Sequence, residues 1–229
     1  MRNRLFILIL LGFLTIGLPM TAAALGMDVE AKAGAGLALG TTNNTSATGT
    51  ARVAAGGGVG IDLYLLKLGS IDLGIAVGAE YSYLSFHSQW TNFLPGVDQT
   101  ADSNYGYLNI PIALVGRIPL TQSIQVVVRA GMFIGDFLGG TSNDTYNPDI
   151  GQNGPQTLDS SNTYQMEYGL HITAGTDIAL GGSLTLAPAI QFDMGLTDTS
   201  KPIPLPNGTD FKDTFWSLTL VVGIKYNVI

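Results

Sequence analysis

Histidine, serine and carboxylate side chains are the groups in this sequence that could carry acid–base or nucleophilic chemistry. His171 follows Glu167 by four residues and precedes Thr173 by two, within a stretch of alternating apolar and polar residues. In a β-strand this spacing puts the three side chains on one face. A proton-transferring histidine would fit, but we favour a hydrogen-bonded member of a buried polar network, because buried polar groups need partners.

His87 lies beside Ser85 and Ser88, the residue types of a serine nucleophile and its base. Nucleophilic catalysis also requires a group that orients the histidine and donors that stabilise the oxyanion. The sequence identifies neither group, so we expect His87 to be an ordinary polar residue near the end of a strand. We therefore predict no catalytic residues.

Metal and cofactor sites are not predicted either. The chain has no cysteine and two histidines, which leaves few ligands for a zinc site. Residues 143–151 carry several oxygen ligands but lack the closing glutamate of a calcium-binding loop, so we expect a solvated turn. The glycines between 56 and 60 are not followed by a helical pattern, which argues against a phosphate-binding loop.

The elements that must position these residues are strands. Between Ile71 and Tyr83, large apolar residues and alanine alternate with small or polar residues. This period-two pattern places successive side chains on opposite faces of a strand. Pro111 interrupts another such stretch and lacks a backbone donor, so we expect it to mark a bulge. Eight stretches alternate in this way: residues 27–40, 51–63, 71–85, 104–118, 123–138, 163–179, 183–197 and 213–228.

The connections between these stretches alternate in length. Short turns are predicted at residues 67–70, 119–122 and 181–182, and long polar loops at residues 41–50, 86–103, 139–162 and 198–212. Short turns at one end and long loops at the other are typical of small outer-membrane barrels. The pattern therefore predicts an all-β fold: an eight-stranded antiparallel up-and-down transmembrane β-barrel, a meander with four long extracellular loops.

Composition and the amino terminus agree with this location. Hydrophobic residues make up 46% of the chain and charged residues only 12%, about half the usual charged share of a soluble domain. Arg2 and Arg4 precede an apolar run and the small residues up to Ala24. We predict a cleaved signal peptide over residues 1–24 and one barrel domain over residues 25–229, in the bacterial outer membrane. The net charge of −7 argues against nucleic-acid binding.

Alternation alone does not say which face of the strands meets lipid, because a soluble lipocalin-like barrel has the same period. Small residues and charges of both signs on the polar face favour a narrow lumen, and aromatic residues near the strand ends favour interfacial girdles. The predicted polar network of the lumen comprises Lys32, Arg52, Glu80, Arg129, Glu167, His171, Asp193 and Lys225. The predicted girdle comprises Tyr81, Tyr83, Tyr164, Trp216 and Tyr226.

Short motifs carry a resemblance to a known family. The segment Tyr107-Leu108-Asn109-Ile110-Pro111-Ile112, followed later by Arg129-Ala130-Gly131, resembles two strands of the PorT-type outer-membrane β-barrel domain. Residues 192–198 are similar to the seventh strand of that family. Residues 223–228 resemble the carboxy-terminal signal read by the outer-membrane insertion machinery, with Ile229 in place of the usual terminal aromatic residue. The resemblance implies an eight-stranded outer-membrane barrel.

Function is less constrained than architecture. We expect a non-enzymatic, sealed scaffold that presents extracellular loops for envelope integrity, adhesion or other surface interaction. A narrow channel for small or apolar solutes and a lipid-modifying or proteolytic enzyme using His87 or His171 are the alternatives. The expected partners are outer-membrane lipids, the insertion machinery and extracellular ligands of residues 86–103 and 139–162. We expect a monomer without cofactors.

Overall fold

The structure is a computed structural model that describes residues 25–42, 47–158, 166–197 and 213–228. The predicted signal peptide, residues 1–24, lies outside this part of the chain. The strands are β1 (Gly26–Thr42), β2 (Ala47–Leu68), β3 (Ile71–Leu94), β4 (Val97–Pro119), β5 (Ile124–Asn147), β6 (Gly154–Leu158), β7 (Glu167–Gly181), β8 (Leu184–Gly195) and β9 (Asp213–Asn227). Within the described residues, no helix has the length and apolar character needed to cross a membrane.

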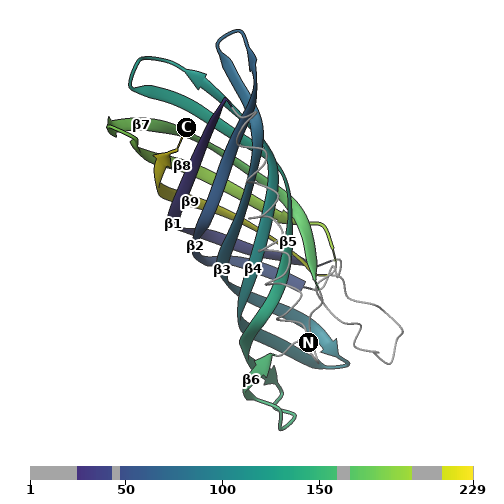
Figure 1. Ribbon diagram of the computed structural model, residues 1–229. Coiled ribbons are helices and arrows are strands. Elements are labelled where there is room, and N and C mark those ends of the chain that lie inside the picture. The colour runs from purple at the N-terminus through teal and green to yellow at the C-terminus, as the bar shows by residue number, and fades with distance from the viewer. Residues whose placement is uncertain (1–24, 43–46, 159–165, 198–212, 229) are drawn as a thin grey trace, which may run out of the picture.

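Eight of these strands close into a barrel. The strand order is β4-β3-β2-β1-β9-β8-β7-β5-β6, and β4 also pairs with β5, so the ring runs β1-β2-β3-β4-β5-β7-β8-β9 and returns to β1 (Figure 1). Each neighbouring pair is antiparallel, and the short β6 pairs with the end of β5 that extends past β7. Apart from the addition of β6, this is the predicted eight-stranded meander.

The apolar face of the strands points outward. On β9, Leu220 is 67% exposed, whereas Lys225 is 2% exposed. Alternating side chains of β4 follow the same pattern, with Leu114 outside and Val115 inside. Because exposed leucine and buried lysine are unfavourable in water, this arrangement suits a barrel surrounded by lipid and rules out a soluble barrel with an apolar interior.

Three tight turns join strands at the end of the barrel predicted to face the periplasm. Gly69 follows β2 with φ of 64°, and Gly182 follows β7 with φ of 60°, a backbone region that favours glycine. The turn between β4 and β5 is closed by hydrogen bonds from the backbone N–H groups of Leu120 and Thr121 to the carbonyl oxygen of Ile124. The first described residues and Val228 lie at this end as well.

The opposite end differs from the prediction in three places. Residues 86–103, predicted as a loop, continue β3 and β4 as a paired hairpin that turns at residues 95–96. Residues 139–162 were also predicted as a loop, but β5 continues to Asn147 and β6 returns beside it. Sequence alternation fades in these polar segments because neither face meets lipid, yet the backbone ladder continues (Figure 1). The predicted loop at residues 41–50 is also shorter than expected, because β1 continues to Thr42 and β2 begins at Ala47, while residues 43–46 lie outside the described residues. The predicted loop at residues 198–212 lies entirely outside them.

Pro111 does not form the predicted bulge. On either side of it, Val77 pairs with Ile112 and Glu80 pairs with Asn109, so the register between β3 and β4 does not shift. Residues 78, 79, 110 and 111 lack a pair on that side, while Pro111 still pairs with Phe133 of β5. The register shifts elsewhere, and one of these β-bulges lies on β2, where residues 52 and 53 stand opposite one residue of β3.

Candidate functional site

The lumen is filled by layers of charged and polar side chains that reach across the barrel. Nearest the short turns, Arg117 of β4 donates to Asp28 of β1 at 3.2 Å and to Asp72 of β3 at 3.1 Å. Its guanidinium group also lies 3.9 Å from the centroid of the Tyr64 ring. These contacts close the lumen at this end with a cation held by two carboxylates and an aromatic face.

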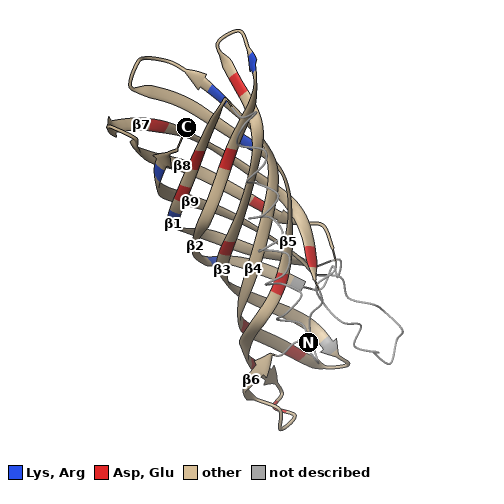
Figure 2. Cartoon of the chain, viewed as in Figure 1, with Lys and Arg blue, Asp and Glu red and all other residues tan. Residues whose placement is uncertain are grey.

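The next layer is centred on two buried cations. Arg129 of β5 donates to Asp62 of β2 at 2.6 Å and to Glu30 of β1 at 2.7 Å. Lys225 of β9 donates to Asp177 of β7 at 2.8 Å and lies 3.6 Å from Asp62. The layer thereby ties together five of the eight barrel strands, and Figure 2 shows acidic and basic residues interspersed along those strands.

A third layer contains the predicted histidine. His171 is 3% exposed, and its Nδ1 lies 2.6 Å from Oδ1 of Asp193 while its Nε2 lies 3.2 Å from the hydroxyl of Thr173. Gln191 donates hydrogen bonds to Asp193 at 2.7 Å and to Glu80 at 3.0 Å. Glu80 also forms an ion pair with Lys32 at 2.7 Å. His171 is therefore an interior member of a hydrogen-bonded network.

An aromatic cluster covers this network on the extracellular side. Phe86 of β3 stacks on Phe215 of β9 with ring centroids 4.5 Å apart, and Tyr105 of β4 lies 5.3 Å from Phe215. Tyr107 of β4 and Phe137 of β5 complete the cluster. We call these five residues the aromatic plug. The alternating pattern predicts the strands that carry these residues. It does not predict that aromatic rings from four different strands meet inside the barrel.

The predicted lumen residues divide into two groups. Lys32, Glu80, Arg129, His171, Asp193 and Lys225 lie in the layers just described, and Glu167 lies in the lumen beside the aromatic plug. Arg52 does not lie in the lumen: its side chain is 45% exposed and pairs with Asp102 at 2.7 Å. The bulge at residues 52–53 of β2 is the reason, because the extra residue turns Arg52 away from the interior.

Around Arg52 the structure also places His87. Its Nδ1 lies 2.8 Å from Oδ1 of Asp102, a residue directly across from it on β4. Asp102 is thus in position to orient His87. The sequence did not predict this contact, because it depends on the register between β3 and β4. Ser85 shares the outward face of β3 with His87, but among the described residues no serine hydroxyl lies within hydrogen-bonding distance of His87. We call Arg52, His87 and Asp102 the rim cluster.

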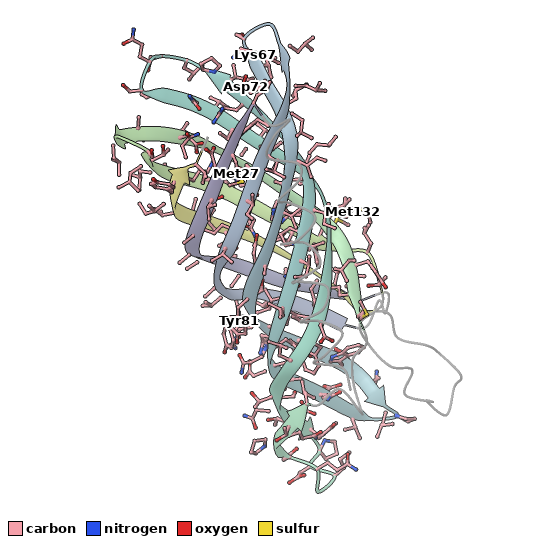
Figure 3. All side chains as sticks on the ribbon, viewed as in Figure 1. Met27, Lys67, Asp72, Tyr81 and Met132 are labelled. Carbon is pink, nitrogen blue, oxygen red and sulfur yellow. The ribbon has the colours of Figure 1, made fainter. Side chains whose placement is uncertain are left out.

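The predicted girdle residues that the structure describes face outward. Tyr81 and Tyr83 lie towards the extracellular end of β3, and Tyr226 lies near the opposite end of β9. Figure 3 shows Tyr81 projecting away from the barrel wall. Trp216 packs its ring 6.4 Å from Phe192 on the outer surface. Tyr164 lies outside the described residues. No group of three or more histidine, cysteine, aspartate or glutamate side chains that could hold a metal ion occurs in the described part of the chain.

Comparison with known proteins now places the barrel in a family. The family model described as the outer membrane protein beta-barrel domain matches residues 24–201. The chain belongs to this outer-membrane barrel family. The barrel is accordingly located in the bacterial outer membrane. The PorT-type resemblance is not tested further by this match. No curated protein sequence matches the barrel.

Solved structures are similar to this outer-membrane barrel in fold. OprG of Pseudomonas aeruginosa has a TM-score of 0.52 at 12% identity, covering 89% of this chain and 96% of that one. Neisserial surface protein A has a TM-score of 0.44 at 11% identity, covering 87% and 96%. The outer membrane enzyme PagL has a TM-score of 0.40 at 18% identity, covering 86% and 97%. Identities this low show the barrel fold alone.

Proposed function

We propose that this outer-membrane barrel is a non-enzymatic, sealed scaffold that presents extracellular hairpins for envelope integrity or surface interaction. The observation that carries the proposal is the filled lumen. The aromatic plug, the Lys32 to His171 layer and the Arg129 layer each extend from one wall to another. An eight-stranded barrel has an interior just wide enough for side chains to fill, so these layers leave little space for solute.

The extracellular hairpins supply the surface that the scaffold would present. Backbone pairing continues from Phe86 with Ser103 to Leu94 with Val97, and β5 and β6 pair between residues 140 and 158. Side-chain hydrogen bonds reinforce this region, including Ser103 with Ser142 at 2.9 Å and Gln156 with Asp144 at 3.2 Å. A paired sheet holds its surface residues in place before binding, which lowers the entropic cost of recognition.

Shortening the hairpins tests the leading proposal. Residues 89–100 can be replaced by Asn-Gly, which joins the paired positions Ser88 and Ala101 with a tight turn. A second variant replaces residues 144–154 in the same way. We expect both variants to insert normally but to lose attachment to host surfaces or resistance of the cells to detergent. Unchanged attachment and resistance in the double variant would contradict the proposal.

A channel for small solutes is the second candidate, and planar-bilayer recordings distinguish it from the scaffold. The scaffold predicts no discrete current steps from the purified barrel under an applied voltage. Regular steps of uniform size would favour the channel, because conduction requires a continuous water path past Phe86 and Phe215. An unrelated porin in the same lipid serves as the positive control.

One observation in the rim cluster favours the enzyme alternative, namely the short contact between His87 and Asp102. This pair resembles the base and orienting acid of a hydrolase, but the scaffold proposal treats it, with Arg52, as a polar anchor of β2, β3 and β4. His87→Gln and Ser85→Ala should therefore leave the lipid profile of the outer membrane unchanged in mass spectrometry. A lipid species that accumulates in both variants would support an enzyme.

A further inference from the structure

Glu167 is the lumen carboxylate that stands apart from the others. It is 3% exposed at the start of β7, and within the described ranges it forms neither an ion pair nor a hydrogen bond. Every other described lumen-facing carboxylate has a nitrogen partner within 3.2 Å, namely Asp28, Glu30, Asp62, Asp72, Glu80, Asp177 and Asp193. An ionisable side chain inside a membrane protein without a partner is a strong indication of a functional site.

The Glu167 carboxylate borders a small cavity between the polar network and the aromatic plug. The cavity has a volume of about 20 Å³, room for one water-sized particle, and Asp193, Ser82 and Ser217 also line it. The carboxylate extends towards β8, where a Cβ atom at Gly195 would overlap one of its oxygens. Asp193 lines the same space but is already paired with His171 and Gln191, and no lysine, arginine or histidine lines the cavity among the described residues.

Two buried polar atoms without partners face the same region. The hydroxyl of Tyr107, a residue with 0% exposure, and Oδ1 of Asn109 have no hydrogen-bond partner in the described part of the chain, and both residues line the cavity. Nδ2 of Asn109 donates to Ser82 at 3.0 Å, which directs Oδ1 towards Gly135. A Cβ atom at Gly135 would lie 2.6 Å from Oδ1 of Asn109 and 3.6 Å from Cβ of Glu167. The amide oxygen and Glu167 therefore border one space.

We propose that this cavity binds one small monovalent cation such as Na⁺, held by oxygens of Glu167, Asn109 and Tyr107. All three ligands are oxygen atoms, which hard cations prefer. A bound cation balances the charge that Glu167 places in a lipid-surrounded lumen and supplies a partner for the unpartnered oxygens of Tyr107 and Asn109. The small volume favours Na⁺ over large organic cations. The inference goes beyond the scaffold proposal and does not depend on it.

Cation-dependent stability is the direct test. The refolded barrel is unfolded in detergent at alkaline pH, where protons compete least, in NaCl or in choline chloride at equal ionic strength. The boiling-dependent gel shift reports the folded fraction. Because a ligand that binds only the folded state stabilises it by mass action, a tenfold rise in Na⁺ above its dissociation constant should raise the folded-to-unfolded ratio about tenfold. Choline should have no comparable effect.

Variants assign the dependence to this cavity. Glu167→Gln should abolish the difference in stability between Na⁺ and choline. Asp177→Asn removes a partner of Lys225 in another layer, so it should lower the stability in both salts but keep the difference between them. Tyr107→Phe keeps the carboxylate and removes one oxygen, so it should weaken the Na⁺ effect even if Glu167→Gln fails to fold.

Two results would overturn the proposal. Equal stability of the unaltered barrel in Na⁺ and choline would mean that Glu167 is buried in its protonated form beside water rather than a cation. A Na⁺ effect that persists undiminished in Glu167→Gln, or in Tyr107→Phe if the first variant does not fold, would place the cation elsewhere.

Discussion

At the scale of single residues, burial decides which ion pairs matter to this barrel. Arg129 is 7% exposed and holds Glu30 and Asp62 together, whereas Arg52 sits at the rim with a side chain that water reaches readily. Removing one partner of a buried pair leaves an uncompensated charge, while exposed pairs contribute little. The two arginines therefore form a matched comparison within one protein.

We expect Arg129→Met to lower the free energy of unfolding by about 3–5 kcal/mol, because Glu30 and Asp62 lose their shared guanidinium group. Arg52→Met should cost about 1 kcal/mol or less. Urea titration of the barrel in phospholipid vesicles, followed by tryptophan fluorescence, measures both. Equal costs for the two substitutions would mean that the lumen network contributes no more than the rim cluster.

At the scale of elements, close approach of β1 and β9 closes the barrel and depends on glycine. A Cβ atom at Gly36 of β1 would overlap the backbone carbonyl oxygen of Leu218 on β9. At Gly116 of β4 the nearest atom would be a methyl carbon of Leu73 at 3.6 Å, an ordinary contact. Gly36 at the seam between the first and last strands is therefore far more sensitive to side-chain size than Gly116.

We expect Gly36→Ala to destabilise the barrel by about 1–3 kcal/mol, since overpacking forces the two strands apart. Gly116→Ala should be close to neutral and serves as the control. The fraction of protein that migrates as the folded form without boiling reports the difference. If Gly36→Ala folds as well as Gly116→Ala, the seam is more pliable than the contacts indicate.

The extended hairpins are a second element-scale feature, and they lie outside the lipid-facing belt. Their removal takes away polar surface but leaves Phe86, the plug and the three charged layers in place. We expect the hairpin-shortened variants to keep the boiling-dependent gel shift and a β-rich circular dichroism spectrum. Loss of the shift in a shortened variant would show that the hairpins are needed for closure of the barrel.

At the scale of the whole molecule, the plug separates the charged lumen from the cell exterior. Replacing Phe86 and Phe215 by alanine removes the stacked pair that spans the barrel from β3 to β9. We expect this double variant to admit small ions and to produce current fluctuations that the unaltered barrel lacks. A matched double variant, Tyr81→Ala with Tyr83→Ala, alters aromatic residues on the outer face of β3 and should remain silent. Silence of the plug variant would mean that the charged layers seal the lumen by themselves.

The sequence by itself determined the architecture of this protein. Period-two alternation is a local property of each strand, so it identified the barrel strands, their two faces and the three tight turns. The prediction that Lys225 and Arg129 face inward rested on the same local pattern. Strand ends were harder, because residues 86–103 and 139–162 lack an apolar face and look like loops in sequence although the backbone remains paired.

Only the tertiary structure decided which side chains meet. Arg129 and Glu30 are 99 positions apart, and their contact depends on the register of the closed ring. The same register sets Asp102 opposite His87, while a one-residue bulge turns Arg52 outward against the expectation from alternation. It also leaves the Glu167 carboxylate, beside Tyr107 and Asn109, without a partner among the described residues. Contacts across a barrel depend on closure and register. These are properties of the whole sheet, so the sequence of a single strand does not determine them.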